Sequence, residues 1–392
     1  MKTIKVIIAL AFTLMISYTV TAQDTKKEDT FKPTMKIEGR IMFDFNFLSA
    51  GDYNFAGNEF RRVRLAAKGK VTNNIGYKAE FDFAGGEVNF RDVYLKYSLP
   101  NSKGNVILGS FTEPSSLNNM TSSKYITFFE RSMLSNTQPF KYNAGIMYDN
   151  QKLFDGKMGL QVAYTFNGDK SKAFKDTSVD GGVNFIARAT TAILKDSEKK
   201  QVVHLGVNYE RRDNDSDSYK YKFRTENHMG NKTTVEAPGI FENTSDIGFE
   251  IASTFGSLSI QGEYEISSIK TDLDTYKTNG YYAFVSYFIT GEHRPYKNSS
   301  FGRVKPKKIF GKDSGLGALE LVARYSSMDF SSWNAADSDD KISNITVGFN
   351  WHLNNNTRVM YNFVSGDHGN LAPANYNDDN LTGHLIRFQI DF

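Results

Sequence analysis

The chain of 392 residues contains no cysteine, which excludes disulfides and thiolate metal sites. It has only 8 prolines, and no Pro/Gly/Ser-rich linker divides it into domains. Neither sign of charge dominates, because 47 Lys and Arg stand against 44 Asp and Glu. Beyond the N-terminus, no stretch approaches the ~18 apolar residues that a membrane-spanning helix needs. We therefore expect neither a disulfide framework nor a transmembrane helix.

The N-terminal stretch "MKTIKVIIALAFTLMISYTVTA" is typical of a secretory signal peptide. Lys2 and Lys5 precede an apolar run that ends near Ile16, and Ala22 fits a cleavage site. The alternative is a membrane anchor, but the run is shorter than a spanning helix requires. We expect a signal peptide over residues 1–22, a short periplasmic segment over 23–34 and one domain over 35–392.

Alternation of period two recurs along the rest of the chain. In "RRVRLAAKGKV", the apolar Val63 and Leu65 alternate with Arg62 and Arg64. The final "HLIRFQIDF" repeats this pattern. Strict alternation over eight or more residues predicts strands with one apolar and one polar face. A soluble β-sandwich is the alternative, but it rarely sustains about ten alternating residues in strand after strand. The pattern favours a transmembrane antiparallel β-barrel.

About sixteen alternating segments can be counted, and an even number places both termini on the periplasmic side. Tight turns are expected at "TNN" (72–74), "GS" (256–257) and "NNN" (354–356), and long external loops at 113–142, 213–244 and 366–380. The aromatic Phe392 at the end of an amphipathic strand fits a signal for barrel insertion. Arg61 and Arg91 fall on the nominal lipid face, and we expect them at strand ends, where long side chains reach polar surroundings.

One long connection, residues 291–316, falls on the periplasmic side. Its segment "RPYKNSSFGRVKPKK" (294–308) holds six basic residues and no acid. Such a segment is either a disordered loop or a turn that folds up into the lumen. Aromatic and apolar residues interleave with the cations, which favours insertion.

The sequence resembles the phosphate-selective porin O and P family. The resemblance rests on "FRRVRLAAKG" (60–69), "NFRDVYLKY" (89–97), "GSFTEPSSLNNMTSSKYITFFERS" (109–132), "GEHRPYKNSSFGRVKPKK" (291–308), "GALELVARYSSMDF" (317–330), "NITVGFNWHLNNNTRVMYNFV" (344–364) and "RFQIDF" (387–392). It implies a sixteen-stranded, trimeric barrel whose third and fifth external loops and long periplasmic turn enter the lumen. Two departures weaken the phosphate assignment: Thr112 stands where the family commonly has Lys, and the fifth loop (211–230) is rich in acids.

A channel selects anions by lining its narrow part with cations. The residues that we expect to line the anion path are Arg62, Arg64, Lys68, Lys70, Asp92, Ser122, Ser123, Lys124, Arg131, Arg303, Lys305, Lys307 and Lys308. Asp92 would be a lone acid that lets a bound anion leave, and the two serines would donate hydroxyls. The alternative for each cation is an ordinary ion pair across a polar lumen.

The sequence therefore predicts an outer-membrane porin for passive diffusion of anions, phosphate or polyphosphate among them. A general porin or a plugged structural barrel is the alternative. No HExxH, GxSxG or P-loop sequence occurs, so we expect no enzyme, metal or cofactor. The expected partners are phosphate and chloride, outer-membrane lipid, the barrel assembly machinery and two further copies of the chain, with no nucleic acid.

Overall fold

The computed structural model describes residues 31–137, 142–166, 182–213, 218–333, 340–376, 378 and 380–392. The chain divides into two units, Met1–Lys32 and Pro33–Phe392, and the barrel lies in the second. The expected signal peptide (1–22) and residues 23–30 of the expected periplasmic segment (23–34) lie outside the described residues, so both stay predictions.

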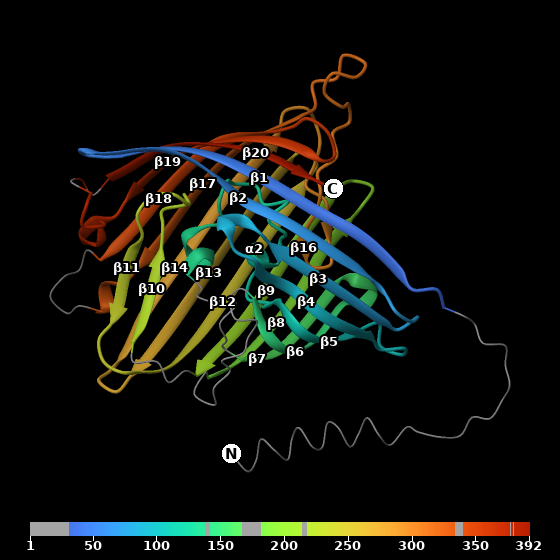
Figure 1. The fold of residues 1–392 in the computed structure, drawn as a ribbon, viewed down its shortest axis with the longest axis horizontal. Coiled ribbons are helices and arrows are strands. Elements are labelled where there is room, and N and C mark those ends of the chain that lie inside the picture. The colour runs from blue at the N-terminus through green and yellow to red at the C-terminus, as the bar shows by residue number, and fades with distance from the viewer. Residues whose placement is uncertain are drawn as a thin grey trace, which may run out of the picture. The chain divides into compact units, whose positions relative to one another are not determined.

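The described part of the second unit forms a closed antiparallel barrel of sixteen strands (Figure 1), which confirms the predicted fold class. Around the barrel the strands are β1 (Thr34–Ala50), β2 (Tyr53–Lys70), β3 (Ile75–Asp82), β4 (Asn89–Ser98), β5 (Asn105–Thr112), β6 (Tyr142–Leu153), β7 (Met158–Phe166), β8 (Val183–Asp196), β9 (Gln201–Asp213), β12 (Phe241–Phe255), β13 (Leu258–Thr271), β14 (Thr275–Phe288), β17 (Ala318–Asp329), β18 (Lys341–His352), β19 (Thr357–Asp367) and β20 (Asn380–Asp391). The first and last strands pair antiparallel and close the sheet.

Because neighbouring strands alternate in direction, the start of β1 and the end of β20 share one end of the barrel, here called the terminus end. The expected tight turns at 72–74, 256–257 and 354–356 lie there. The opposite, loop end carries the long connection between β5 and β6, here called the third loop (113–141). Among the described residues, no helix is long and apolar enough to cross a bilayer.

The two faces of the sheet differ as the alternation predicts. On β2, the outward-facing Leu65 is 45% exposed, whereas the inward-facing Arg64 is 9% exposed. The outer face carries exposed Phe, Ile, Leu and Tyr from almost every strand, which suits contact with lipid. The inner face is polar and is largely covered by other parts of the chain.

Connections from both ends fill part of the lumen. The loop end contributes α2 (Leu117–Met120) and α3 (Met133–Thr137) from the third loop, and a hairpin of β10 (Tyr219–Phe223) and β11 (Thr233–Ala237). The terminus end contributes residues 289–317, here called the inward turn, with the small hairpin β15 (Tyr296–Lys297) and β16 (Ser300–Phe301). Short 3-10 turns lie at η1 (Ala84–Gly86), η2 (Phe154–Gly156), η4 (Ser331–Trp333) and η5 (Gly369–Leu371).

Candidate functional site

The third loop is fastened along one wall of the barrel by inward-facing side chains of β17–β20. The side-chain amide of Asn350 donates to the carbonyl of Thr127 at 2.7 Å, and the amide of Gln389 to that of Lys124 at 3.0 Å. Arg358 donates to the carbonyl of Ile126 at 2.9 Å. These bonds satisfy loop carbonyls that would otherwise be buried without partners. Open space lies between the loop and the wall that continues from β20 into β1–β4, since β20 pairs with β1.

A buried carboxylate anchors the loop to the neighbouring strands. Glu130, 3% exposed, accepts hydrogen bonds from Arg61 at 2.8 Å and Arg387 at 2.9 Å, and Arg62 lies 3.8 Å away. Arg387 also binds Asp44 through two bonds of 2.7 Å. Burial alone would raise the pKa of Glu130, but the surrounding guanidiniums lower it well below its ordinary value. The carboxylate is therefore held ionised by three arginines.

The largest open space that we describe is a cavity of about 540 Å³, here called the main cavity. Among the described residues that line it, seven are basic and two are acidic. The basic residues are Lys36, Arg40, Arg64, Lys68, Lys78, Lys124 and Arg303, and the acidic residues are Glu38 and Glu80. The wall therefore carries a clear excess of positive charge.

Strand register places these charges in rows. Lys36 of β1 pairs with Lys68 of β2, which pairs with Lys78 of β3. Four residues further along β1, Arg40 pairs with Arg64. Like charges that face each other across strands repel, and an acidic residue between the two rows offsets this repulsion.

That acidic residue is Glu80. It accepts from Arg40 at 2.9 Å and lies 2.6 Å from the ammonium of Lys78 and 3.3 Å from Arg64. Its cross-strand partner on β2 is the small Ala66, which leaves room for the three cations to converge. One carboxylate therefore holds together three positive groups.

A second cavity of about 260 Å³, here called the upper cavity, shares several lining residues with the main cavity. The shared residues are Arg40, Arg64, Lys78, Glu80 and Ser122. Asp92 and Asp149 add acidic groups there. Asp92 binds Lys78 at 2.6 Å and accepts the backbone N–H of Thr112 at 3.0 Å. The shared residues form the boundary between the two cavities.

The inward turn enters the lumen, as the sequence predicts. Tyr296 hydrogen bonds His204 of β9 at 2.7 Å, and the carbonyl of Ser299 accepts from Arg188 of β8 at 3.1 Å. Further along the turn, Arg303 forms an ion pair with Asp391 of β20. The turn therefore crosses the interior of the barrel from the β8–β9 wall to the last strand.

The structure brings together only part of the predicted lining set. Arg64 and Ser122 line both cavities; Lys68, Lys124 and Arg303 line the main cavity; and Asp92, Ser123 and Arg131 line the upper cavity. Arg62 lies in the Glu130 cluster, and Lys70 is exposed near a turn, where it contacts the carbonyl of Asn73. Lys305, Lys307 and Lys308 are exposed on the inward turn.

Two loop residues differ in how free their charges are. Arg131 is buried and donates to the carbonyls of Asn118 at 2.9 Å and Thr121 at 2.8 Å, so its guanidinium braces the loop. Burial lowers the pKa of Arg131 to about 10. Lys124 is half-buried at the main cavity, and burial together with the nearby Arg40 lowers its pKa. Ser123 accepts from Arg40 at 2.6 Å, which places that hydroxyl beside a cation.

The sequence analysis missed Arg40 and Lys78 as lining residues. Lys78 lies on the polar face of an alternating segment, and Arg40 follows the same alternation through Lys36 and Glu38. The signal was therefore present, but the pairing of these residues with Arg64 and Lys68 depends on strand register. Asp92, expected as a lone acid, shares the lumen with Glu80 and Asp149.

The prediction that Arg61 and Arg91 sit at strand ends is wrong for Arg61, although its charge does reach polar surroundings at Glu130. Residue 61 lies inside β2, where the register with β1 shifts by one residue between Met42 and Phe43. A similar register shift near the start of β4 leaves Arg91 out of the regular alternation. Arg91 donates to Asp82 at 3.1 Å. A β-bulge adds one residue and redirects its side chain, so both guanidiniums turn inward.

The described part of the fifth loop also enters the barrel. Glu226 is 1% exposed and binds Arg324 of β17 at 3.0 Å and Thr346 of β18 at 2.6 Å. His228 lies 2.6 Å from Glu59 of β2. Glu226 of this loop thus faces inward-pointing side chains of the wall. Residues 214–217 of the loop lie outside the described residues.

Comparison with known proteins identifies the family. Residues 35–392 match "Phosphate-selective porin O and P". Porin O of Pseudomonas aeruginosa is 28% identical over 415 residues, which cover 94% of this chain and 90% of that protein. The fold resembles OmpT of Vibrio cholerae in its trimer form (TM-score 0.58, 14% identity, 92% of this chain and 99% of that one). It also resembles an anion-selective porin from Comamonas acidovorans (TM-score 0.56, 14% identity, 92% and 100%). This chain belongs to the phosphate-selective porin O and P family, as the sequence predicts, and is an outer-membrane barrel porin of a Gram-negative bacterium.

Proposed function

We propose that this porin lets small inorganic anions diffuse passively through the main and upper cavities. The observation that carries the proposal is the ratio of seven basic to two acidic side chains around the main cavity. Walls of low dielectric focus the field of such a cluster, which raises the local anion concentration and the rate of entry. The reversal potential of the channel in a salt gradient tests this selectivity.

The family description and the relative's name support phosphate among these anions. Arg40, Arg64 and Ser122 line the junction of the two cavities, and Lys124 lines the main cavity. A guanidinium offers a planar fork of donors that matches phosphate, and an ammonium adds a compact charge. These groups come from strands and from the third loop, so several donors can converge on one ion.

Ion pairs inside the lumen favour modest phosphate affinity. Glu80 already occupies donors of both Arg40 and Arg64, and a bound phosphate would compete with it. The runner-up function is therefore a general anion porin without phosphate preference. We expect millimolar phosphate to reduce chloride current in a saturable way, and more strongly than sulfate does. Equal block by the two anions would favour the general porin.

We further propose a homotrimer that sits in outer-membrane lipid and is inserted by the barrel assembly machinery through its last strand. The trimer form of the Vibrio cholerae structure and the exposed apolar outer face support this proposal. Purified protein should then run as an SDS-resistant species that dissociates on boiling. A single monomeric species without boiling, under conditions that keep the barrel folded, would contradict the trimer.

A further inference from the structure

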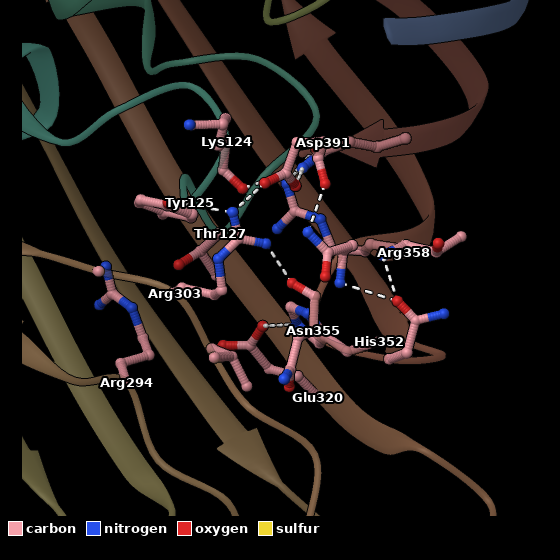
Figure 2. A pocket seen from close by; sticks show the side chains of 16 residues that line it. Lys124, Tyr125, Thr127, Arg294, Arg303, Glu320, His352, Asn355, Arg358 and Asp391 are labelled. Carbon is pink, nitrogen blue, oxygen red and sulfur yellow. Dashed lines mark hydrogen bonds and ion pairs between the residues drawn. The ribbon is translucent and has the colours of Figure 1, made fainter. Parts of the chain in front are cut away.

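The last part of the inward turn leaves the lumen and returns to the edge of the barrel. Figure 2 shows Arg303 of this turn inside the barrel, beside Asp391 of β20, with which it forms an ion pair. Residues 305–316, here called the rim segment, follow Arg303 and lead back to the start of β17 at the terminus end. The backbone N–H of Phe310 donates to the carbonyl of Leu353, directly after β18, at 2.8 Å. The rim segment is therefore fixed to the ends of the strands.

The rim segment also reaches the outer face of the barrel. Trp351 of β18 lies on that face, because it continues the alternation of the exposed Val347 and Phe349. Its ring centre lies 4.9 Å from that of Phe310 at an interplanar angle of 81°, and its indole N–H donates to the carbonyl of Leu316 at 2.7 Å. Tryptophan is enriched where a membrane meets water. A turn that starts in the lumen thus ends against the lipid-facing surface.

Three large apolar side chains of the rim segment are exposed. Ile309, Phe310 and Leu316 are 41%, 47% and 71% exposed. Hydrogen bonds within the turn hold their backbone: the N–H of Lys312 donates to the carbonyl of Ile309 at 3.2 Å, and that of Gly315 to the carbonyl of Lys312 at 2.8 Å. Exposed apolar groups that gather in one place, with polar residues around them, mark a surface that contacts a membrane or another molecule.

The same segment is strongly basic. Its charged residues, all exposed, are Lys305, Lys307, Lys308, Lys312 and Asp313. None of these five forms an ion pair with another described residue. The buried Glu292 accepts the backbone N–H of Lys307 at 2.9 Å and adds one further acid nearby. Four lysines stand against these two acids, which leaves an excess of positive charge beside the apolar side chains.

We propose that the rim segment binds the headgroup of an anionic phospholipid in the membrane leaflet at the terminus end, which the sequence predicts to be periplasmic. The lipid phosphate contacts the ammoniums of Lys308 and Lys312, which flank Ile309 and Phe310 in the chain. The apolar side chains lie against the acyl chains next to Trp351. The stem of a lysine can lie along apolar surface while its ammonium reaches the headgroups, and basic residues are attracted to an anionic membrane surface.

The apolar side chains distinguish a lipid from a free phosphate ion, which offers the lysines the same chemistry. A free ion gains nothing from Ile309, Phe310 and Leu316, whereas a phospholipid contacts the apolar and the basic groups at once. The patch is also continuous with the exposed outer face through Trp351. The proposal concerns this outer surface, so it does not depend on which anion passes through the lumen.

Tryptophan fluorescence can report on this contact, because the chain has only two tryptophans. Trp351 lies against the rim segment, whereas Trp333 is 9% exposed and packs in an apolar cluster inside the barrel. Bromine atoms on a lipid acyl chain quench the fluorescence of a tryptophan that the chain touches. Trp333→Phe makes Trp351 the sole reporter in the folded porin, reconstituted in phosphatidylcholine bilayers. The unsubstituted protein serves if Trp333→Phe does not fold, since Trp333 is buried.

At equal mole fractions, brominated phosphatidylglycerol should quench Trp351 about threefold more strongly than brominated phosphatidylcholine, because the lysines attract the anionic headgroup. Lys308→Gln combined with Lys312→Gln should bring the two lipids close to equal quenching. Lys199→Gln combined with Lys200→Gln is the matched control: it removes two exposed lysines from the β8–β9 turn at the same end, and the preference should remain. Inorganic phosphate added at constant ionic strength should leave the preference unchanged.

Equal quenching by the two lipids before any lysine is replaced, or a preference that survives the loss of Lys308 and Lys312, would overturn the proposal. Loss of the preference in the control variant would show a general effect of surface charge, and loss in phosphate would show a site for the free ion; either result overturns the proposal as well. Quenching by neither lipid would mean that a second copy of the chain covers the rim segment, which also contradicts it.

Discussion

Arg303 of the inward turn forms an ion pair with Asp391 of β20, 88 residues away in the sequence. Arg303 also contacts the hydroxyl of Tyr125 in the third loop at 3.3 Å and lines the main cavity. The basic segment 294–308 therefore divides its charges. Arg294 and Arg303 are held inside the barrel, whereas Lys297, Lys305, Lys307 and Lys308 are exposed. The two kinds of cation should have different effects on ion flow.

We expect Arg303→Gln to move the reversal potential clearly toward zero, because it removes a charge from the wall of the main cavity. Lys307→Gln removes a charge from the same turn, but an exposed one, and should shift the potential less. The difference should shrink at high salt, where screening shortens the reach of fixed charges. Equal shifts in the two variants at low salt would place the exposed lysines in the permeation path as well.

Substitutions at Arg40 and at Arg131 should distinguish direct contact with the anion from support of the third loop. Arg40→Gln removes a guanidinium at the junction of the cavities and should weaken phosphate block of chloride current several-fold. Arg131→Ala removes two hydrogen bonds to loop carbonyls, so we expect noisier single-channel current as the loop loosens. If Arg131→Ala abolishes the block while the current stays quiet, Arg131 contacts the anion directly.

Glu130→Gln should destabilise the barrel, because it leaves the buried Arg62 and Arg387 and the half-buried Arg61 around a neutral group. Breaking one side of a buried ion pair typically costs about 3–5 kcal/mol. Denaturant unfolding of the refolded protein measures this loss. Glu236→Gln is the matched control: it removes an exposed carboxylate that pairs with the exposed Lys220 across the β10–β11 hairpin, and it should change little. Similar losses in both variants would argue against a special role for the Glu130 cluster.

The stabilisation by Glu130 should depend on pH. The pKa of Glu130 is lowered in the folded state, so the folded protein favours the carboxylate more than the unfolded chain does. Its contribution is complete above the unfolded pKa of about 4.3 and is lost as the pH falls toward the folded value. The stability difference between wild type and Glu130→Gln should therefore shrink from pH 7 to pH 3. A difference that stays constant over this range would contradict the assignment.

The strands could be predicted because alternation is a local property of the sequence. The sixteen observed strands agree with the count of about sixteen alternating segments, and the inward turn was predicted from its mixed basic and aromatic composition. Side-chain directions that depend on how neighbouring strands pair could not be predicted in the same way. Arg61 is an example, since a single extra residue in β2 reverses the direction of its side chain.

The lining residues were predicted only in part for the same reason. Arg64 and Lys68 follow from the alternation of one strand, but the rows that they form with Arg40 and Lys78 require the register of three strands. Arg131 has the expected residue type in the expected loop. Its guanidinium, however, satisfies loop carbonyls whose position is set by distant strands, and alternation carries no information about such contacts.

The central claim is that the fixed charges of the lumen select anions. The reversal potential of the purified wild-type porin in a planar bilayer, under a tenfold gradient of potassium chloride, tests it most directly. The account predicts a steady conductance and a reversal potential whose sign shows preference for chloride, with the preference weakening as both salt concentrations rise. A reversal potential at zero or of the opposite sign, or a barrel that passes no steady current, would contradict it.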